Sequence, residues 1–241
     1  MTRLRPLEGR TALVTGASRG IGAAVARRLA ASGARVALLA RDKETLRALA
    51  QEIGGGAVCL ACDVRDTVTL ARALDQLPDL IGGAPCIVVN NAGAFFIAPV
   101  QETSVDAFAE TLAVNLTAPF AVVRAMLPAM VKSGGGHVVT IGSIADRAPF
   151  PGNAAYAASK HGLRALHEVL RAELRASGVR ISLVSPGPVN TDLWNSINPE
   201  HHAGVPPRAD MLSAEAVADA VHWIVTAAPD VNVDELRLSR S

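Results

Sequence analysis

Aromatic side chains and cysteines are both scarce in this chain of 241 residues. Phe, Trp and Tyr together make up 3% of it, and Tyr156 is its only tyrosine. Three cysteines are too few for a disulfide framework. Cys59 and Cys62 have the Cys-x-x-Cys spacing of a redox or zinc site, but they lie in an apolar run and no second pair exists. We therefore expect reduced, buried thiols and no metal.

Net charge is lacking as well. The 23 basic and 22 acidic residues give a formal charge of +1, so composition provides no case for nucleic acid or a membrane surface as a partner. No apolar run reaches the roughly 18 residues of a membrane-spanning helix. The first ten residues contain no apolar signal core. We expect a cytoplasmic protein.

Hydrophobic residues, by contrast, make up half of the chain, enough for a large core. Short apolar runs typical of buried strands alternate with helical patterns from end to end, which favours a parallel sheet with helices on both faces. No linker or repeat interrupts this alternation, so we expect one α/β domain over residues 1–241. Strands are predicted at 11–15, 35–39, 57–62, 86–89, 136–141, 180–184 and 231–238.

A glycine-rich stretch, Gly16-Ala-Ser-Arg-Gly20-Ile-Gly22, follows the first predicted strand and leads into a helix that ends near residue 32. Glycines permit a tight turn and a close approach of the backbone to phosphate, and the helix N-terminus supplies free N–H groups. The alternative is an ordinary strand-to-helix turn. The position after the first strand favours a dinucleotide site.

Charges at the end of the second strand indicate which dinucleotide binds. An acidic residue there holds a ribose 2′-OH, whereas an arginine accommodates a 2′-phosphate. Ala40 occupies the usual acidic position, Arg41 follows it, and Arg19 adds a second cation from the glycine loop. Asp42 is acidic, but it is also placed to cap the helix predicted from Lys43. The pattern favours NADP over NAD.

Polar residues also follow the third and fourth strands. Asp63 and Val64 end the third, and Asp63 could reach an adenine amino group, because Asp66 is better placed to cap the next helix. Asn90-Asn91-Ala92-Gly93 ends the fourth and would border the adenosine. An ordinary turn is the alternative explanation for these Asn and Gly residues.

A long helix is predicted from about residue 104 to 131, with Asn115 among apolar neighbours. A buried amide needs hydrogen-bond partners. Pro119, four residues later, cannot donate a backbone hydrogen bond to the Asn115 carbonyl. We expect a local kink at Asn115 with water in the gap; the alternative is an amide satisfied within the core.

Tyr156 and Lys160 lie four residues apart in a predicted helix, so their side chains share one face. A nearby ammonium favours a phenolate and lowers the phenol pKa, which makes the pair a candidate general acid/base. Ser143 ends the fifth strand, at the sheet edge where ligands bind in α/β folds. A half-buried tyrosine beside a surface lysine is the alternative.

An irregular segment, 192–211, is long enough to be a substrate lid. Trp194 opens it and could cover a substrate. His201 and His202 are adjacent and have no third ligand nearby, so we interpret them as loop residues. Arg147 could face a substrate carboxylate, although an exposed loop arginine explains it as well. Trp223 lies in a helical pattern and is predicted to be in the core.

Taken together and in this order, these motifs resemble those of the short-chain dehydrogenase/reductase family over essentially the whole chain. The motifs are Thr15-Gly-Ala-Ser-Arg-Gly-Ile-Gly22, Asp63-Val64, Asn90-Asn-Ala-Gly93, Asn115, Ser143, Tyr156-x-x-x-Lys160 and Pro186-Gly-Pro-Val-Asn-Thr191. Each is weak alone, but the ordered set is specific.

The resemblance implies a doubly wound, seven-stranded Rossmann sheet and a catalytic tetrad of Asn115, Ser143, Tyr156 and Lys160. Tyr156 would exchange a proton with the substrate oxygen, Ser143 would hydrogen-bond that oxygen, Lys160 would hold the nicotinamide ribose and lower the Tyr156 pKa, and Asn115 would place a water. The implied cofactor-binding residues are Gly16, Ser18, Arg19, Gly20, Ile21, Gly22, Arg41, Asp63, Val64, Asn91, Ala92, Gly93, Tyr156, Lys160, Pro186, Gly187, Val189 and Thr191.

The chain departs from common family patterns in two places. It ends without the frequent glycine-rich motif, and its ending looks more like members that act on small hydroxy acids, amino alcohols or pterins. Ala155 stands where reductases of acyl-carrier-protein thioesters often have Asn. Both departures weigh mildly against fatty-acid synthesis.

We therefore expect an NADP(H)-dependent oxidoreductase that interconverts a carbonyl and a secondary alcohol on a small molecule. A 3-oxoacyl-(acyl-carrier-protein) reductase is the alternative enzyme, and a non-catalytic NADP-binding sensor or scaffold is the alternative from another class. The helices at 104–131 and 155–177 carry apolar residues on more than one face, and the resemblance suggests that they pair in a homodimer or homotetramer.

Overall fold

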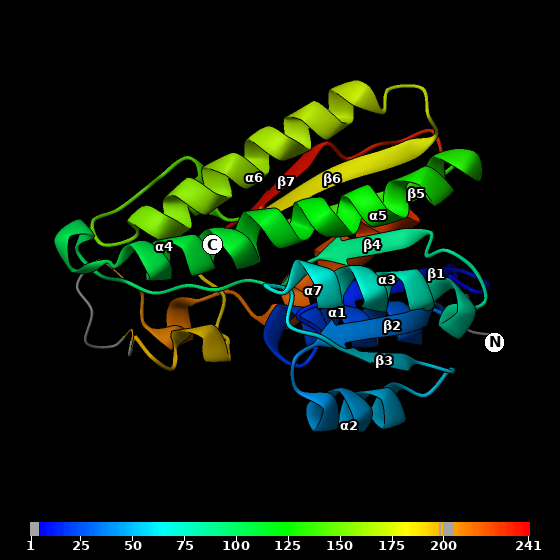
Figure 1. Cartoon of the computed structure of the whole chain (residues 1–241), viewed down its shortest axis with the longest axis horizontal. Helices are drawn as coiled ribbons and strands as arrows, with labels where there is room; N and C mark the ends of the chain where they lie inside the picture. Colours follow the sequence, from blue (N-terminus) through cyan, green and yellow to red (C-terminus); the bar gives the residue numbers. More distant parts are fainter. Residues whose placement is uncertain (1–4, 198, 200–204) are drawn as a thin grey trace.

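The computed structural model describes residues 5–197, 199 and 205–241. The described residues form one seven-stranded parallel sheet in the order β3-β2-β1-β4-β5-β6-β7 (Figure 1). Its strands are β1 Thr11–Thr15, β2 Arg35–Ala40, β3 Val58–Ala61, β4 Ile87–Asn90, β5 Gly136–Ile141, β6 Val179–Pro186 and β7 Glu235–Leu238. The predicted doubly wound fold is confirmed.

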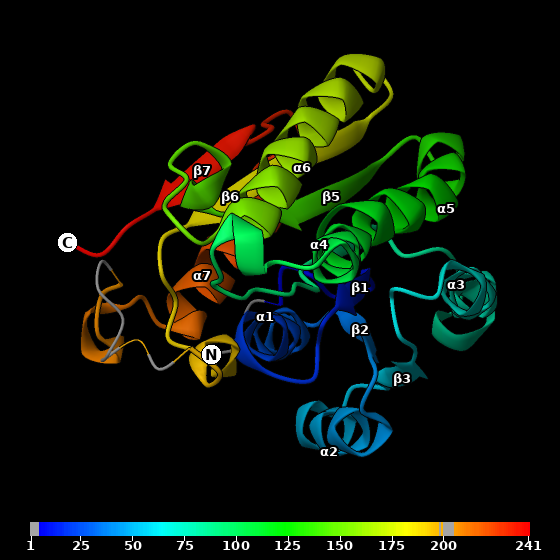
Figure 2. The same cartoon turned by 60° about the vertical axis from the view of Figure 1, so that its left-hand side comes forward.

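Helices cover both faces of the sheet (Figure 2). They are α1 Gly20–Ala31, α2 Lys43–Ile53, α3 Thr67–Ile81, α4 Val105–Leu112, α5 Ala118–Lys132, α6 Ala154–Glu173 and α7 Ala214–Thr226. Buried residues of α1, α2 and α7 form one hydrophobic cluster with the sheet, and those of α3, α5 and α6 form another. The sheet is therefore buried on both sides.

Strand side chains alternate between these two clusters. In β1, Ala12 and Val14 belong to the cluster with α1, whereas Leu13 belongs to the cluster with α3. Successive residues of a strand point to opposite faces. A strand buried on both faces must therefore be apolar along its whole length, as the uninterrupted apolar runs in the sequence indicated.

The chain order reverses beside β1. The chain winds outward from β1 through β2 to β3, then returns to place β4 on the other side of β1. Such a reversal opens a crevice at the carboxyl ends of the strands, because the connections there diverge toward opposite faces. This crevice holds the site described below.

The predicted long helix is interrupted where the kink was expected. Residues Ala113–Thr117 form a π-helical turn between α4 and α5, and the N–H of Ala118 bonds to the carbonyl of Ala113. Pro119 has no N–H to donate to the Asn115 carbonyl, so an α-helical hydrogen bond cannot form between these two residues. The wider π-helical turn accommodates the missing bond.

The whole stretch Val105–Lys132 is nevertheless one continuous helical run of 28 residues, with an 18-residue window of mean hydropathy 1.5. The expectation that no apolar run reaches the length of a membrane-spanning helix is therefore wrong. By length and composition it could cross a membrane, although core helices pass the same test. Here α5 packs Val122, Val123 and Met126 into the cluster with α3.

Two sequence-based expectations about the C-terminal part are wrong. Trp223 is not in the core, because 56% of it is exposed on α7. The last strand begins at Glu235 rather than Val231. The Asn232 side chain explains the late start: its amide donates to the Ile181 carbonyl at 3.1 Å and accepts from the Ile181 N–H at 3.1 Å. A side chain thus replaces backbone pairing at that position.

Candidate active site

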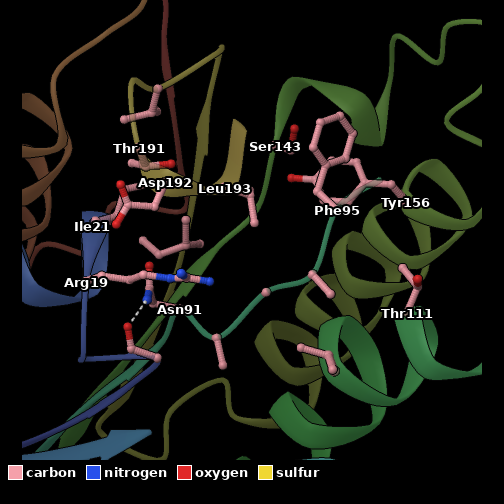
Figure 3. A pocket seen from close by; sticks show the side chains of 18 of the residues that line it. Arg19, Ile21, Asn91, Phe95, Thr111, Ser143, Tyr156, Thr191, Asp192 and Leu193 are labelled. Carbon is pink, nitrogen blue, oxygen red and sulfur yellow. Dashed lines mark hydrogen bonds between the residues drawn. The ribbon is translucent and has the colours of Figure 1, made fainter. Parts of the chain in front are cut away.

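A cavity of about 920 Å³ lies at the carboxyl ends of the strands. Its lining comes from the segments that follow β1 to β6, which are far apart in the sequence (Figure 3). Among the predicted site residues, all line the cavity except Gly22 and Asn115. The structure therefore brings the predicted cofactor and catalytic residues into one place.

The glycine loop fits its predicted role through close backbone packing. Gly16 has φ +64°, and a Cβ there would lie 2.8 Å from the Ala92 Cα. A Cβ on Gly22 would lie 2.2 Å from the Gly16 carbonyl oxygen. No side chain in the described part of the chain caps α1, so its first N–H groups are available to a pyrophosphate.

Asn91 and Thr15 brace this loop against the end of β4. The Asn91 side-chain amide donates to the carbonyls of Thr15 at 2.9 Å and Gly16 at 3.2 Å (Figure 3). The Thr15 hydroxyl accepts from the N–H groups of Asn91 and Ala92, both at 3.0 Å. Asn91 therefore lines the cavity, but its side-chain amide holds the glycine loop in shape.

The end of β2 has the charge pattern expected for a 2′-phosphate site. Asp42 caps α2, accepting from the N–H groups of Glu44 and Thr45 at 3.0 Å each, so the capping interpretation is confirmed. The side chains of Arg19 and Arg41 line the cavity and make no ion pair or hydrogen bond with the described residues. Two unpaired guanidinium groups suit a phosphate.

Asp63 is not free, contrary to the sequence-based expectation. The guanidinium of Arg65 holds its carboxylate, with the shortest contact 2.7 Å from Nη2 to Oδ2. Hydrogen bonds from Arg65 hold the pKa of Asp63 below its ordinary value. Arg65 also lies 3.4 Å from Glu110 of α4. Asp66 caps α3 as predicted, accepting from Val68 and Thr69 N–H groups at 3.0 Å.

Tyr156 and Lys160 lie on the first turns of α6, which begins at Ala154, one residue before the predicted start at 155. The Lys160 ammonium is 5.5 Å from the centroid of the Tyr156 ring. It is buried and donates to the carbonyl of Ile141, the last residue of β5, at 2.9 Å. Tyr156 and Ser143 lie close together at the cavity (Figure 3).

Burial dominates the acid–base properties of this pair. It lowers the pKa of Lys160 to about 8 and raises the pKa of Tyr156 above its ordinary value. A hydrogen bond with Ser143 opposes the rise at Tyr156. The Asp146 carboxylate raises the pKa of both groups. The expected lowering of the Tyr156 pKa is therefore wrong for this structure, because the sequence shows the ammonium but not the apolar surroundings.

Asn115 lies fully buried in the π-helical turn. Its side-chain oxygen accepts from the Ala94 N–H at 2.8 Å, and its nitrogen donates to the Ala94 carbonyl at 2.9 Å and the Ser159 hydroxyl at 3.0 Å. The amide is thus satisfied within the core, as the alternative interpretation held. Its side chain fixes the segment after β4 to the helix that carries Tyr156.

The turn after Ser143 contains a charge cluster that the sequence analysis missed. Asp146 is 1% exposed, and its Oδ2 accepts from the Ser185 hydroxyl of β6 at 3.1 Å. Arg147 lies 3.5 Å from the other Asp146 oxygen and forms a two-bond ion pair with Glu235 of β7. Arg147 therefore faces Glu235 and does not line the cavity.

Aromatic side chains form the other wall of the cavity. The rings of Phe95 and Tyr156 meet edge-on with centroids 4.7 Å apart, and Phe95 meets Trp194 at 5.1 Å. Trp194 is 8% exposed, and its Nε1 donates to the Val189 carbonyl at 3.0 Å. Phe95 was not predicted, since nothing in the stretch after Gly93 distinguishes it from an ordinary apolar residue.

The predicted lid, 192–211, includes short 3₁₀ turns at Asp192–Trp194 and Arg208–Asp210. His201 and His202 lie outside the described residues, and the lid stays a prediction. Within the described ranges, no group of three or more His, Cys, Asp and Glu residues is placed to hold a metal ion. Cys59, Cys62 and Cys86 are free thiols as expected, but of the three only Cys62 is buried, and Cys59 and Cys86 are half-buried.

Comparison with known proteins identifies the family. Residues 10–202 match the sequence model of the short chain dehydrogenase family. The chain therefore belongs to the short-chain dehydrogenase/reductase family, as its motifs indicated. It is an oxidoreductase, and its family uses a nicotinamide cofactor.

Three similar proteins illustrate the range of this family. D-threitol dehydrogenase of Mycolicibacterium smegmatis is 38% identical over 209 residues, which cover 86% of this chain and 78% of that protein. The 3-oxoacyl-(acyl-carrier-protein) reductase FabG of Escherichia coli is 32% identical over 222 residues, 91% of each chain. A metagenomic short-chain oxidoreductase solved in complex with NADP has a TM-score of 0.84 and 37% identity, covering 98% of this chain and 99% of that one.

Proposed function

We propose that this protein is an NADP(H)-dependent oxidoreductase that interconverts a carbonyl and a secondary alcohol on a small molecule, with Tyr156 as the general acid/base. One observation carries the proposal: Tyr156 and Ser143 line the same cavity as the glycine loop and the unpaired Arg19 and Arg41. A group that can exchange a proton therefore lies beside a place built for a dinucleotide.

Each tetrad residue has a role that its geometry supports. A bound nicotinamide supplies or accepts the hydride at the carbonyl carbon. Tyr156 gives its proton to the carbonyl oxygen during reduction and takes it back during oxidation. Ser143, hydrogen-bonded to Tyr156, holds that oxygen in place. Lys160 presents a buried ammonium one helical turn away. Asn115 positions α6 through Ser159, and its backbone carbonyl, to which Pro119 cannot donate, is where we propose that a water binds.

The preference for NADP rests on Arg41 and Arg19. Charge-assisted hydrogen bonds are worth about 1.5–3 kcal/mol, or roughly tenfold to a hundredfold in affinity. Arg41→Ala should therefore weaken NADPH binding by at least about tenfold and leave NADH binding nearly unchanged. Calorimetric titration of both cofactors measures this difference. An equal loss for the two cofactors contradicts the assignment.

Turnover tests the function directly. NADPH oxidation is followed with a panel of ketones and aldehydes in the wild-type protein and in Tyr156→Phe, which removes one hydroxyl and retains the ring. We expect turnover to fall by about 10²–10⁴-fold, because no other tyrosine can supply the proton. NADPH affinity should stay within about twofold of the wild type, since the glycine loop and Lys160 remain. Full turnover in Tyr156→Phe would falsify the mechanism.

Two alternatives are separated by the same assay. The similarity to FabG supports a 3-oxoacyl thioester reductase, and preferential turnover of acetoacetyl thioesters would establish it. A sensor or scaffold would bind NADPH without oxidising it. The location of Tyr156, Ser143 and Lys160 at one cavity supports an enzyme, because a sensor needs the glycine loop alone.

We also propose a homo-oligomer, with α4 and α5 in the subunit interface. Phe108 is partly exposed, Val105 and Val131 are exposed, and Phe120 is 50% exposed, all on the Val105–Lys132 run. Large apolar side chains on a helix that already packs one face on the sheet favour a second partner. The cytoplasmic location stays a prediction from the sequence.

A further inference from the structure

The few aromatic residues of this chain are concentrated at one cavity. The chain has eight of them, and five line the cavity. These five are Phe95, Phe96, Phe150, Tyr156 and Trp194. Aromatic side chains lining a pocket provide large apolar surfaces for a ligand. Their concentration here therefore carries information about the substrate.

Three of these rings form a continuous series that starts at Tyr156. Phe95 packs against Tyr156 at 4.7 Å with an interplanar angle of 63°, and against Trp194 at 5.1 Å with 73° (Figure 3 labels Phe95 and Tyr156). The Trp194 N–H is already used by the Val189 carbonyl. A substrate whose oxygen meets the Tyr156 hydroxyl must therefore place its neighbouring group against ring surfaces.

Cations are found elsewhere in the cavity. Among the described residues that line it, the basic ones are Arg19, Arg41, Arg65 and Lys160. The three arginines follow β1, β2 and β3, at the dinucleotide end. Lys160 is buried and donates to the Ile141 carbonyl. Of these described cations, Lys160 alone approaches an aromatic ring of the wall, 5.5 Å from the Tyr156 centroid, and its ammonium is already bonded to the Ile141 carbonyl.

The turn beside Ser143 is also apolar on its cavity side. Ile144, Ala145 and Ala148 line the cavity there. Arg147, between them in the sequence, is paired with Glu235 instead. A carboxylate or phosphate at this position would lose its hydration without gaining a cationic partner from the described residues, which is costly.

We propose that the substrate is a neutral carbonyl compound with an aromatic or similarly bulky apolar group beside the carbonyl, such as an aryl ketone or the matching benzylic alcohol. This inference rests on the proposed function, because it names the substrate class for the same site. An aromatic ring packs edge-on against Phe95 and Trp194 in the arrangement that ring pairs prefer. Its burial also removes apolar surface from water.

The first experiment compares substrates with NADPH as the reductant. Acetophenone and cyclohexyl methyl ketone present a bulky apolar group, a ketotetrose presents hydroxyl groups, and 3-oxobutanoate presents a carboxylate. We expect kcat/KM for both bulky ketones to exceed that for the two polar substrates by at least about a hundredfold.

The outcomes separate this inference from the proposed function. A higher kcat/KM for the ketotetrose or for 3-oxobutanoate overturns the substrate class and leaves the oxidoreductase function in place. If the protein oxidises NADPH with none of the four substrates and with no member of a wider panel of aldehydes and acyl thioesters, the proposed function is overturned. The substrate class is then overturned with it.

A second experiment tests the aromatic wall. Phe150 is 40% exposed at the rim, so Phe150→Ala removes a ring without opening the core. Trp194→Ala removes a buried ring, and Trp223→Ala is the matched control, because Trp223 is exposed on α7 and does not line the cavity.

We expect both cavity variants to raise KM for acetophenone by about tenfold or more. Their NADPH affinity should equal that of the wild type, and the control should match the wild type in both measurements. If Trp194→Ala does not fold, the KM for acetophenone in Phe150→Ala alone tests the proposal. An unchanged KM for acetophenone in the folded cavity variants overturns the proposal.

Discussion

Asp146 should help to set the pH at which Tyr156 works. Its carboxylate is buried near Tyr156 and Lys160, the proposed catalytic residues, and accepts a hydrogen bond from the Ser185 hydroxyl. Asp146→Asn keeps the size of the side chain and an oxygen that can accept the same hydrogen bond, but it removes the negative charge. The substitution therefore isolates the electrostatic contribution of Asp146 from its part in packing.

The sign of the effect follows from the structure. The Asp146 carboxylate raises the pKa of both Tyr156 and Lys160, so its removal lowers both values. During alcohol oxidation Tyr156 must accept a proton, and the rate rises with pH as Tyr156 loses its own proton. The rising part of the profile should therefore move to lower pH in Asp146→Asn.

The size of the shift depends on how far Asp146 is already neutralised. A single charge within about 4–6 Å shifts a pKa by about 1–3 units. The guanidinium of Arg147, 3.5 Å from the carboxylate, screens part of this charge, and Glu235 in turn pairs with Arg147. We therefore expect a shift to lower pH that is smaller than an unscreened charge would give.

The assay is kcat/KM for NADP-dependent oxidation of a secondary alcohol as a function of pH. Ser185→Ala is the matched control, because it removes the hydrogen bond to Asp146 and keeps the charge. Its midpoint should equal that of the wild type. An unchanged midpoint in an active Asp146→Asn protein, a shift to higher pH, or an equal shift in Ser185→Ala would each refute the electrostatic argument.

Three further predictions concern stability, assembly and the glycine loop. His137 is buried with a pKa lowered to about 3; since the unfolded chain binds a proton below pH 6.5 and the folded chain does not, the free energy of unfolding should fall by about 2 kcal/mol from pH 7 to pH 5. His137→Asn should remove this contribution in denaturant titrations, whereas His167 and His222, whose pKa values burial also lowers, leave a residual slope. Phe120→Glu should lower the mass measured by light scattering to that of a 24.9 kDa monomer, and a wild-type monomer would contradict the proposed interface. Gly22→Ala should abolish NADPH binding in calorimetry because its Cβ meets backbone at 2.2 Å, whereas Gly135→Ala, with its nearest contact at 3.7 Å, should not.

The parts of the fold that depend on local chemistry could be predicted from the sequence. The strands β1 and β5 begin and end where the apolar runs do, since strands buried on both faces must be apolar throughout. Asp42 and Asp66 cap α2 and α3 as expected, because a cap bonds to N–H groups two and three residues away. The π-helical turn follows from Pro119, which lies four residues after Asn115 and cannot donate a backbone hydrogen bond to its carbonyl.

The parts that depend on distant neighbours could not be predicted. Trp223 follows a helical pattern that does not show which face meets the sheet, and it is exposed. Asp63 looks free in the sequence, yet Arg65 folds back onto it. The Tyr156 pKa depends on burial and on Asp146, neither of which the Tyr-x-x-x-Lys spacing reveals.

The C-terminal strand shows how such distant contacts connect to the active site. Glu235 of β7 pairs with Arg147 in the turn after Ser143. Its neighbour Asp234 pairs with Arg171 near the end of α6, the helix that carries Tyr156. Two adjacent carboxylates thus join the two elements that bear the proposed catalytic hydroxyl groups of Ser143 and Tyr156, across a large sequence separation. These ion pairs hold β7 against the turn after Ser143 and against α6.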